Sequence, residues 1–316
     1  MVRRYGNLFW LLTMLFISCQ KELCYHHPHD GGEARVRIEY HWDLVDRQPE
    51  VMRVWFYSLD GATSDYVFDV PTSGSGYVSL PVGHYRALTY NSDTDNIFER
   101  NTDDISTIEV FTDKVSLSGA RVRSGTVNKV GDKTIDMLDD PNWMCRDYIN
   151  DVEIYSRDGE DCIVNFTPSQ SVYHVIVNVG VIHGLETTDL VRGALSGCAG
   201  SQFIGEFYPA TMPSTIGFDG IKDGEILHGD FYVFGISDKE SKYELTILFW
   251  RPNGNVYYTF DVTDQIRDAF QKVGGNTKIP IVIDIETDLN INIGNGSGFR
   301  IDVDGWEPIE IVIPLR

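Results

Sequence analysis

Three histidines close to the amino terminus are the most metal-like feature of this sequence. His26, His27 and His29 surround Pro28, and imidazole nitrogens bind zinc and copper well. Apart from Cys24, no ordered acid or sulfur ligand is evident beside them. We therefore interpret the stretch as part of a polar tether and predict no metal site and no cofactor.

An acidic stretch and a serine near glycines offer weaker signals. Residues 91–96 place oxygen-bearing side chains at three alternate positions, as a calcium loop does, but no glycine follows and the twelfth position is Thr102 rather than Glu. Ser196 lacks the glycines two residues away on either side that a nucleophile elbow requires. We interpret the first as a surface loop and the second as part of a strand end.

Carboxylates are abundant but form no distinctive pair. The chain carries 47 acidic residues, so neighbouring pairs such as Asp302 with Asp304, or Glu307 with Glu310, arise by chance. Trp143 and Trp306 could stack on a sugar, although packing in a core or at its rim is the more frequent role. Because no nucleophile, base or metal constellation stands out, we predict that the protein is not an enzyme.

The amino terminus carries an export signal. Arg3 and Arg4 precede an apolar run of about ten residues, too short to span a bilayer and typical of a secretory signal. The stretch LFISC, ending at Cys19, resembles a bacterial lipobox, in which a small residue precedes a lipid-modified cysteine. We predict that residues 1–18 are removed and that acyl chains on Cys19 attach the protein to a membrane. The alternative is an ordinary signal peptide.

The other cysteines number four, an even count in an oxidising compartment. They are Cys24, Cys145, Cys162 and Cys198, and four cysteines allow three pairings. Cys145 and Cys162 are closest in sequence and form our candidate disulfide between neighbouring strands. The alternative is that some of the four are buried thiols.

The composition favours a soluble, acidic, β-rich protein. The formal net charge of −21 argues against nucleic acid as a partner, because binding to phosphates requires a basic patch. Hydrophobic residues make up 42%, which is enough for real cores. The length of 316 residues corresponds to about two ordinary domains.

Period-two alternation of apolar residues predicts short strands along most of the chain. One helix is expected after Thr263 or Asp264, ending at Gly274 and Gly275. The expected strands are 34–43, 51–58, 65–70, 76–80, 84–90, 107–111, 151–156, 161–167, 172–179, 190–196, 214–219, 226–235, 243–250, 255–262, 279–286 and 308–314. The strands 151–156 and 161–167 lie on either side of a turn at residues 157–159, as in a hairpin. Strands with almost no helix predict an all-β protein built of β-sandwiches.

The domain organisation follows from turn-forming residues and from the tether. Residues 19–33 form the tether, and residues 168–171 (PSQS) are the best boundary. We therefore predict an N-terminal sandwich over 34–169 and a C-terminal sandwich over 170–316. The stretch 112–150 is irregular and polar.

The last strand is a candidate for exchange between subunits. Ile309, Ile311 and Ile313 form one apolar face, and only two residues follow residue 314. A terminal strand can detach without breaking a loop, so it either completes its own sheet or fills a groove in a neighbour.

Several stretches together are similar to the fimbrillin-like lipoproteins of Bacteroidales-type bacteria, a family carried as a domain of unknown function. They are the lipobox with CQKELCYHHPH, then LPVGHYRALTYN, VRGALSGCAGS, ILHGDFYVFG, YTFDVTDQI and GFRIDVDGWEPIEIVIPL. The resemblance implies two tandem transthyretin-like β-sandwich domains with Greek-key topology. It carries no catalytic residues to this chain.

The resemblance also implies a role. It suggests a lipid-anchored, surface-exposed outer-membrane protein that serves a fimbria, or pilus, as anchor or accessory subunit, with other fimbrial subunits as partners joined by strand addition. Pilins of this kind are cut at an Arg near the first strand, whereas anchors keep that strand; Arg35, Arg37 and Arg47 are available here. The alternatives are a carbohydrate- or protein-binding surface lipoprotein without a polymer role and, more remotely, a hydrolase.

Overall fold

The computed structural model describes residues 32–59, 61, 65–74, 76–116, 128–130, 133–135, 137–156, 160–237, 242–252, 254–292 and 312–313. Residues 33–316 form one compact unit, and the predicted signal peptide and most of the tether lie outside the described residues. Within the described part, the structure is almost entirely β, which confirms the predicted all-β class. The helical elements there are α2 (Thr263–Val273) and a 3-10 turn (Leu185–Thr187). Neither is long and apolar enough to cross a membrane.

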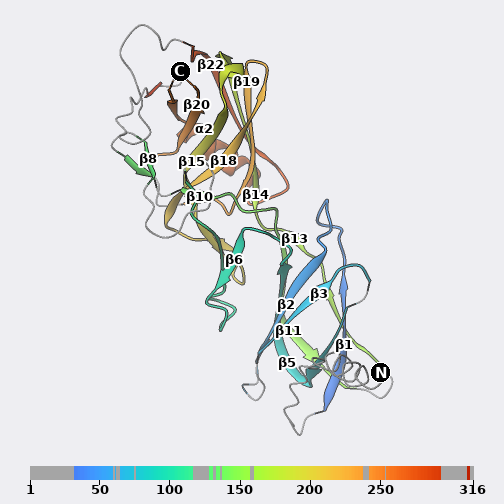
Figure 1. The fold of residues 1–316 in the computed structure, drawn as a ribbon. Coiled ribbons are helices and arrows are strands. Elements are labelled where there is room, and N and C mark those ends of the chain that lie inside the picture. The colour runs from blue at the N-terminus through green and yellow to red at the C-terminus, as the bar shows by residue number, and fades with distance from the viewer. Residues whose placement is uncertain are drawn as a thin grey trace, which may run out of the picture. The chain divides into compact units, whose positions relative to one another are not determined.

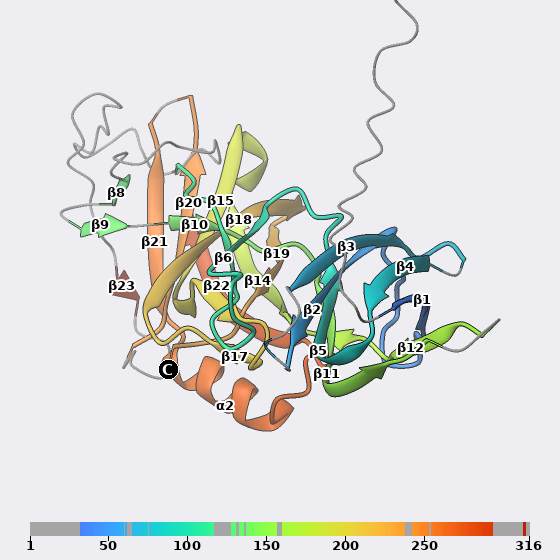
Figure 2. The same ribbon diagram turned by 90° about the horizontal axis from the view of Figure 1, so that it is seen from below.

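The first half of the chain forms two sheets that share a core (Figures 1 and 2). The smaller sheet has the order β12-β1-β4, with β1 (Glu33–Tyr40), β4 (Gly76–Pro81) and β12 (Cys162–Phe166). The larger has the order β13-β11-β5-β2-β3, with β2 (Val51–Ser58), β3 (Tyr66–Pro71), β5 (Gly83–Asn91), β11 (Cys145–Ile154) and β13 (Ser169–Gln170). Side chains from both sheets, including Ile38 and Phe56, are buried between them.

The second half forms one large sheet with α2 packed against its core. Its order is β22-β14-β19-β18-β15-β20-β21-β23, and β10 (Met137–Asp139) pairs with β18. The strands are β14 (Tyr173–His183), β15 (Leu190–Ala199), β18 (Pro213–Asp223), β19 (Ile226–Val233), β20 (Glu244–Trp250), β21 (Val256–Asp261), β22 (Ile281–Asn290) and β23 (Val312–Ile313). Residues 213–219 of β18 pair with β15 and residues 220–223 pair with β19, so this strand joins the two parts of the sheet.

Glycines make room for an aromatic ring in this second core. The ring of Phe218 lies where a Cβ on Gly193 or Gly229 would be, at 1.9 and 2.3 Å. The same ring stacks on Phe231 with centroids 4.2 Å apart. A side chain at either glycine would therefore displace the ring.

Two further sheets complete the described fold. A four-stranded sheet has the order β17-β16-β7-β6 and joins segments far apart in sequence. Its strands are β6 (Ile97–Arg100), β7 (Glu109–Thr112), β16 (Ser201–Phe203) and β17 (Tyr208–Pro209). Beneath it lies a third apolar cluster to which both halves contribute, with Leu88 and Val110 from one and Ala199 and Phe234 from the other. β8 (Asn128–Val130) and β9 (Lys133–Ile135) form a separate hairpin.

Most predicted strands are present, but one expected pairing is absent. The 151–156 and 161–167 strands do not form a hairpin: β11 pairs with β5 and β13, whereas β12 pairs in parallel with β1. The stretch 112–150 is not wholly irregular, because β11 begins at Cys145. The helix begins at Thr263, preceded by Val262, and so starts slightly earlier than predicted. Gly274 ends it with φ of 56°, as predicted.

Candidate functional site

The first strand has an unusual place for a chain segment that follows a tether. β1 lies in the centre of its sheet, antiparallel to β4 and parallel to β12, which is far away in sequence. Its inward side chains Ala34, Val36 and Ile38 are at most 2% exposed and pack in the first core. Removing β1 would leave an apolar groove with free backbone donors and acceptors on both walls.

The outward face of β1 carries two arginines that bind neighbours on the same sheet. The guanidinium of Arg35 lies 4.0 Å from the centroid of the Tyr77 ring, and its Nε is 3.6 Å from Asp161 Oδ1. Arg37 Nη2 is 3.1 Å from Glu39 Oε1. Each arginine lies within a strand that is hydrogen-bonded on both sides, so the backbone at these positions is held in the sheet.

The loop after β1 connects it to the second half of the chain. Arg47 Nη2 donates to the Tyr232 hydroxyl of β19 at 2.9 Å, and its guanidinium lies 5.1 Å from the Trp143 ring centroid. Trp42 and Val45 pack against the same cluster, which contains Trp143 and Tyr232. The loop that follows β1 is thereby fixed to β19.

The predicted boundary at 168–171 is hydrogen-bonded to residues on both sides of it in the sequence. Gln170 accepts from Trp143 Nε1 at 3.0 Å and donates to the Thr277 carbonyl at 2.7 Å, and Thr277 Oγ1 donates to the Gln170 carbonyl at 2.6 Å. Ser171 is fully buried and donates its N–H to the Met144 carbonyl at 2.9 Å. These bonds fix the connection between the two halves. The division into two domains at this point stays a prediction.

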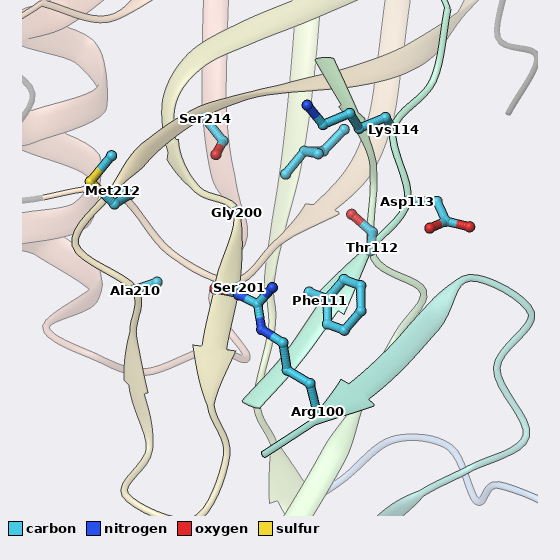
Figure 3. Close-up of a pocket in the computed structure, with 11 residues that line it drawn as sticks. Arg100, Phe111, Thr112, Asp113, Lys114, Gly200, Ser201, Ala210, Met212 and Ser214 are labelled. Atoms are coloured by element: carbon cyan, nitrogen blue, oxygen red, sulfur yellow. The ribbon is translucent and has the colours of Figure 1, made fainter. Parts of the chain in front are cut away.

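A hollow of about 410 Å³ opens beside the four-stranded sheet, with Met212 and Phe111 on opposite sides (Figure 3). At its edge, Arg100 donates two hydrogen bonds of 2.7 Å to Glu109, and Ser201 also donates to Glu109. Burial of the Glu109 carboxyl raises its pKa, but the bonds from Arg100 and Ser201 outweigh this and leave the pKa below its ordinary value. The guanidinium of Arg100 at this edge is thus already paired with a carboxylate of the same sheet.

A second hollow, of about 420 Å³, lies around Arg47, Trp143 and Tyr232. Asp140 lines it, and burial, together with the neighbouring carboxylate of Asp139, raises the pKa of Asp140 to about 7. Asp230 in the same lining receives a 2.6 Å hydrogen bond from His174. Across the described ranges, no three His, Cys, Asp or Glu side chains gather as metal ligands would.

Weaker candidates from the sequence have structural roles. In the 91–96 stretch, Asp93 accepts from the Glu50 N–H at 2.7 Å and Asn96 donates to the Asp140 carbonyl at 2.5 Å, so the loop braces its neighbours. Ser196 Oγ accepts from the Glu244 N–H at 2.8 Å. Trp143 is only 8% exposed and packs in a core rather than on the surface. The three tether histidines, the four carboxylates between 302 and 310, and Trp306 lie outside the described residues.

The candidate disulfide between Cys145 and Cys162 is not formed. Both are free, buried thiols, as is Cys198, whose pKa burial raises to about 12. Cys162 Sγ lies 3.7 Å from the carbonyl oxygen of Glu153, eight residues along β11 from Cys145. At a rise of about 3.3 Å per residue, the two cysteines are roughly 26 Å apart, whereas the Cα atoms of a disulfide lie within about 7 Å. Cys145 begins β11, whereas Cys162 lies beside the other end of that strand, so the two thiols are too far apart to bond.

The remaining predicted site residues fall at the ends of the chain. Cys19, Ile309 and Ile311 lie outside the described residues. Ile313 belongs to β23, which pairs in parallel with β21 at two positions, Thr259 with Val312 and Phe260 with Ile313. The sequence analysis did not identify Tyr232 and Trp143 as partners of Arg47. Nothing in the local sequence marks such distant contacts, and Tyr232 is 185 residues away from Arg47.

Comparisons with known proteins place this geometry in a family. A chain from Bacteroides ovatus named "Putative fimbrium anchoring subunit Fim4B" is 25% identical over 341 residues, with 96% of each chain covered. A solved B. ovatus structure described as a "putative adhesin" has a TM-score of 0.63 at 20% identity and covers 84% of this chain and 95% of its own. The fimbrial anchor protein Mfa2 from Porphyromonas gingivalis gives 0.45 at 15% identity, covering 80% and 89%.

A family model spans parts of both halves of the described chain. The model for a domain of unknown function, DUF5119, matches residues 18–219, which is more than half of the chain. The match begins just before Cys19, includes β1 and the loop that carries Arg47, and extends into β18. The relatives reported above carry the names of fimbrial and adhesin proteins. This chain belongs to the DUF5119 family.

Proposed function

We propose that this protein is the anchor subunit of a fimbrium, attached to the outer membrane through acyl chains on Cys19. The observation that carries the proposal is the position of the first strand: β1 follows the tether directly and occupies the centre of its sheet. The similarity over nearly the full length to a protein named as a fimbrium anchoring subunit supports the same role. The chain would act by binding and holding rather than by catalysis.

An anchor must keep the strand that connects it to its lipid. Val36 and Ile38 of β1 are fully buried. Burial of a side chain of this size stabilises the fold by roughly 1.5–3 kcal/mol. A trypsin-like protease needs an extended, accessible backbone. The backbone of Arg35 and Arg37 is committed to two neighbouring strands, and the side chain of Arg47 is engaged with Tyr232. These contacts support retention of β1 rather than its removal.

The opposite end of the chain supplies the contact to the next subunit in this proposal. β21 has β23 as its outer neighbour, and that pairing involves two residues. A short terminal strand on a sheet edge can detach without breaking a loop and pair with another sheet. Residues 308–314 would close the sheet in the free subunit and would pair with a neighbouring subunit after assembly.

The proposal is tested in the bacterium that produces the protein. Cys19→Ala should leave the protein folded but release it, together with its fimbriae, from the membrane fraction into the medium. The measurement is electron microscopy of cells and medium, with immunoblots of fractions and mass spectrometry for acyl groups on the wild-type chain. Fimbriae that remain attached in the Cys19→Ala strain, or in a strain without the gene, would exclude the anchor role.

A further inference from the structure

We propose that β1 is a mechanical clamp that bears tension along its own axis. The inference rests on the proposed anchor function, because only a membrane-attached subunit is pulled through its tether. It concerns a property of the folded chain itself, namely how its resistance to force depends on the direction of that force.

The two ends of β1 face different parts of the chain. At its amino end, Glu33 follows the tether and pairs with Pro81 at the end of β4. At its carboxyl end, His41 donates its N–H to the Phe166 carbonyl, and the following loop reaches β19 through Arg47 and Tyr232. Tension between the tether and the second half of the chain therefore enters at one end of β1 and leaves at the other.

In the second half, the tension would pass along β19 from one end of the strand to the other. Tyr232 lies next to the last residue of β19 and pairs with His174, the second residue of β14, and the two rings stack with centroids 5.0 Å apart. Ile226 lies at the opposite end of β19, next to the turn that follows Asp223. Asp223 is thus a point of attachment at the far end of β19 from the loop that carries Arg47.

The ladder geometry makes β1 strong in this direction. Its residues pair with six residues of β4 and five of β12. The hydrogen bonds of such ladders run across the strands, so a pull along β1 strains all of them together, whereas a pull across it opens them one after another. Sliding β1 must also draw Val36 and Ile38 out of a fully buried position.

Two pulling directions on the same bonds test the proposal. In the full chain with Cys19→Ser and Cys24→Ser, one handle is attached at Gly32→Cys, where a new Cβ meets no atom within 4 Å. The second handle is placed at Asp223→Cys, which loads β1 along its axis, or at Val82→Cys, beside the β1 amino end, which opens the ladder from that end. Single-molecule force spectroscopy should give a first rupture force at least twofold higher for the first geometry. Equal or reversed forces would overturn the clamp.

A matched pair of truncations identifies the strand that yields. Ile38→Ala in β1 and Ile283→Ala in β22 remove the same atoms from positions that are each fully buried. In the 32/223 geometry, Ile38→Ala should raise the rate of forced unfolding at least tenfold and Ile283→Ala should not change the first rupture. A response to Ile283→Ala alone would show that the second core yields first and would refute the proposal. Loss of the anchor role in cells would leave these forces unchanged, so the two ideas fail separately.

Discussion

The first and last strands of the described chain are held in opposite ways. β1 is an eight-residue strand with a partner on each side, whereas β23 has two residues and pairs with β21. A strand in the centre of a sheet can leave only if two ladders break and a groove opens in the core. A strand at the edge can leave after breaking one short ladder. The comparison teaches that the first strand is held far more firmly than the last, which is the difference that the proposed retention of β1 and exchange of residues 308–314 require.

The contrast between the two strands would be lost if β1 tolerated a charge on its buried face. Val36→Asp places a carboxylate at a fully buried position on the inner face of β1. We expect a loss of about 4 kcal/mol or more in the free energy of unfolding, because an unpaired charge is costly to bury. Urea denaturation followed by circular dichroism measures it. Arg35→Gln, on the outer face of the same strand, is the control and should cost less than about 1 kcal/mol; similar losses for both would contradict the central position of β1.

The pH dependence of stability tests the burial of Asp140, which lies in the region that connects the two halves. The pKa of Asp140 is raised by burial from 3.8 to about 7, so folding favours the protonated acid and stability falls as pH rises between these values. Asp140→Asn should therefore raise stability at pH 8 by about 2 kcal/mol, half of the roughly 4 kcal/mol that three pH units represent. The gain should vanish below pH 4. Thermal unfolding of both proteins from pH 4 to 8 measures it, and a gain independent of pH would contradict the assignment.

Removal of the last strand should have a smaller effect. Truncation after Glu307 deletes β23 and the two described pairs with β21. We expect a folded monomer that is about 1–2 kcal/mol less stable, because each backbone hydrogen bond contributes about 1 kcal/mol, and that no longer joins a polymer. Size-exclusion chromatography, thermal melts and an assembly assay measure these outcomes. Loss of folding would mean that the segment is as essential as β1, and full assembly would mean that it has no role in exchange.

The smallest effect concerns the loop that follows β1. Arg47→Ala removes the 2.9 Å hydrogen bond to Tyr232 and the contact with the Trp143 ring. We expect a loss of about 1 kcal/mol and faster amide hydrogen exchange in residues 41–50, with β1 itself still protected. Arg47→Lys should restore part of the protection because it keeps the charge but not the fork of donors. Equal exchange in all three proteins would show that packing of Trp42 and Val45 alone fixes the loop.

Local patterns in the sequence were sufficient for most elements. Alternation assigned Val36 and Ile38 to one buried face and Arg35 and Arg37 to the other, as the structure shows. A pair of glycines after Val273 correctly ended the helix. Strands β6, β16 and β17 were missed, since each has at most four residues and owes its existence to partners far along the chain.

The sequence by itself determined which residues face inward, where turns fall and that the chain is all-β, because period-two alternation and turn-forming residues act over a few positions. Tertiary structure alone decided which strands are neighbours. β12 pairs with β1 instead of β11, Cys145 is far from Cys162, and Arg47 binds Tyr232. Alternation states the face of a strand but not its partner, since any strand offers the same backbone donors and acceptors on its edges. The partner is selected by how whole faces pack in a common core.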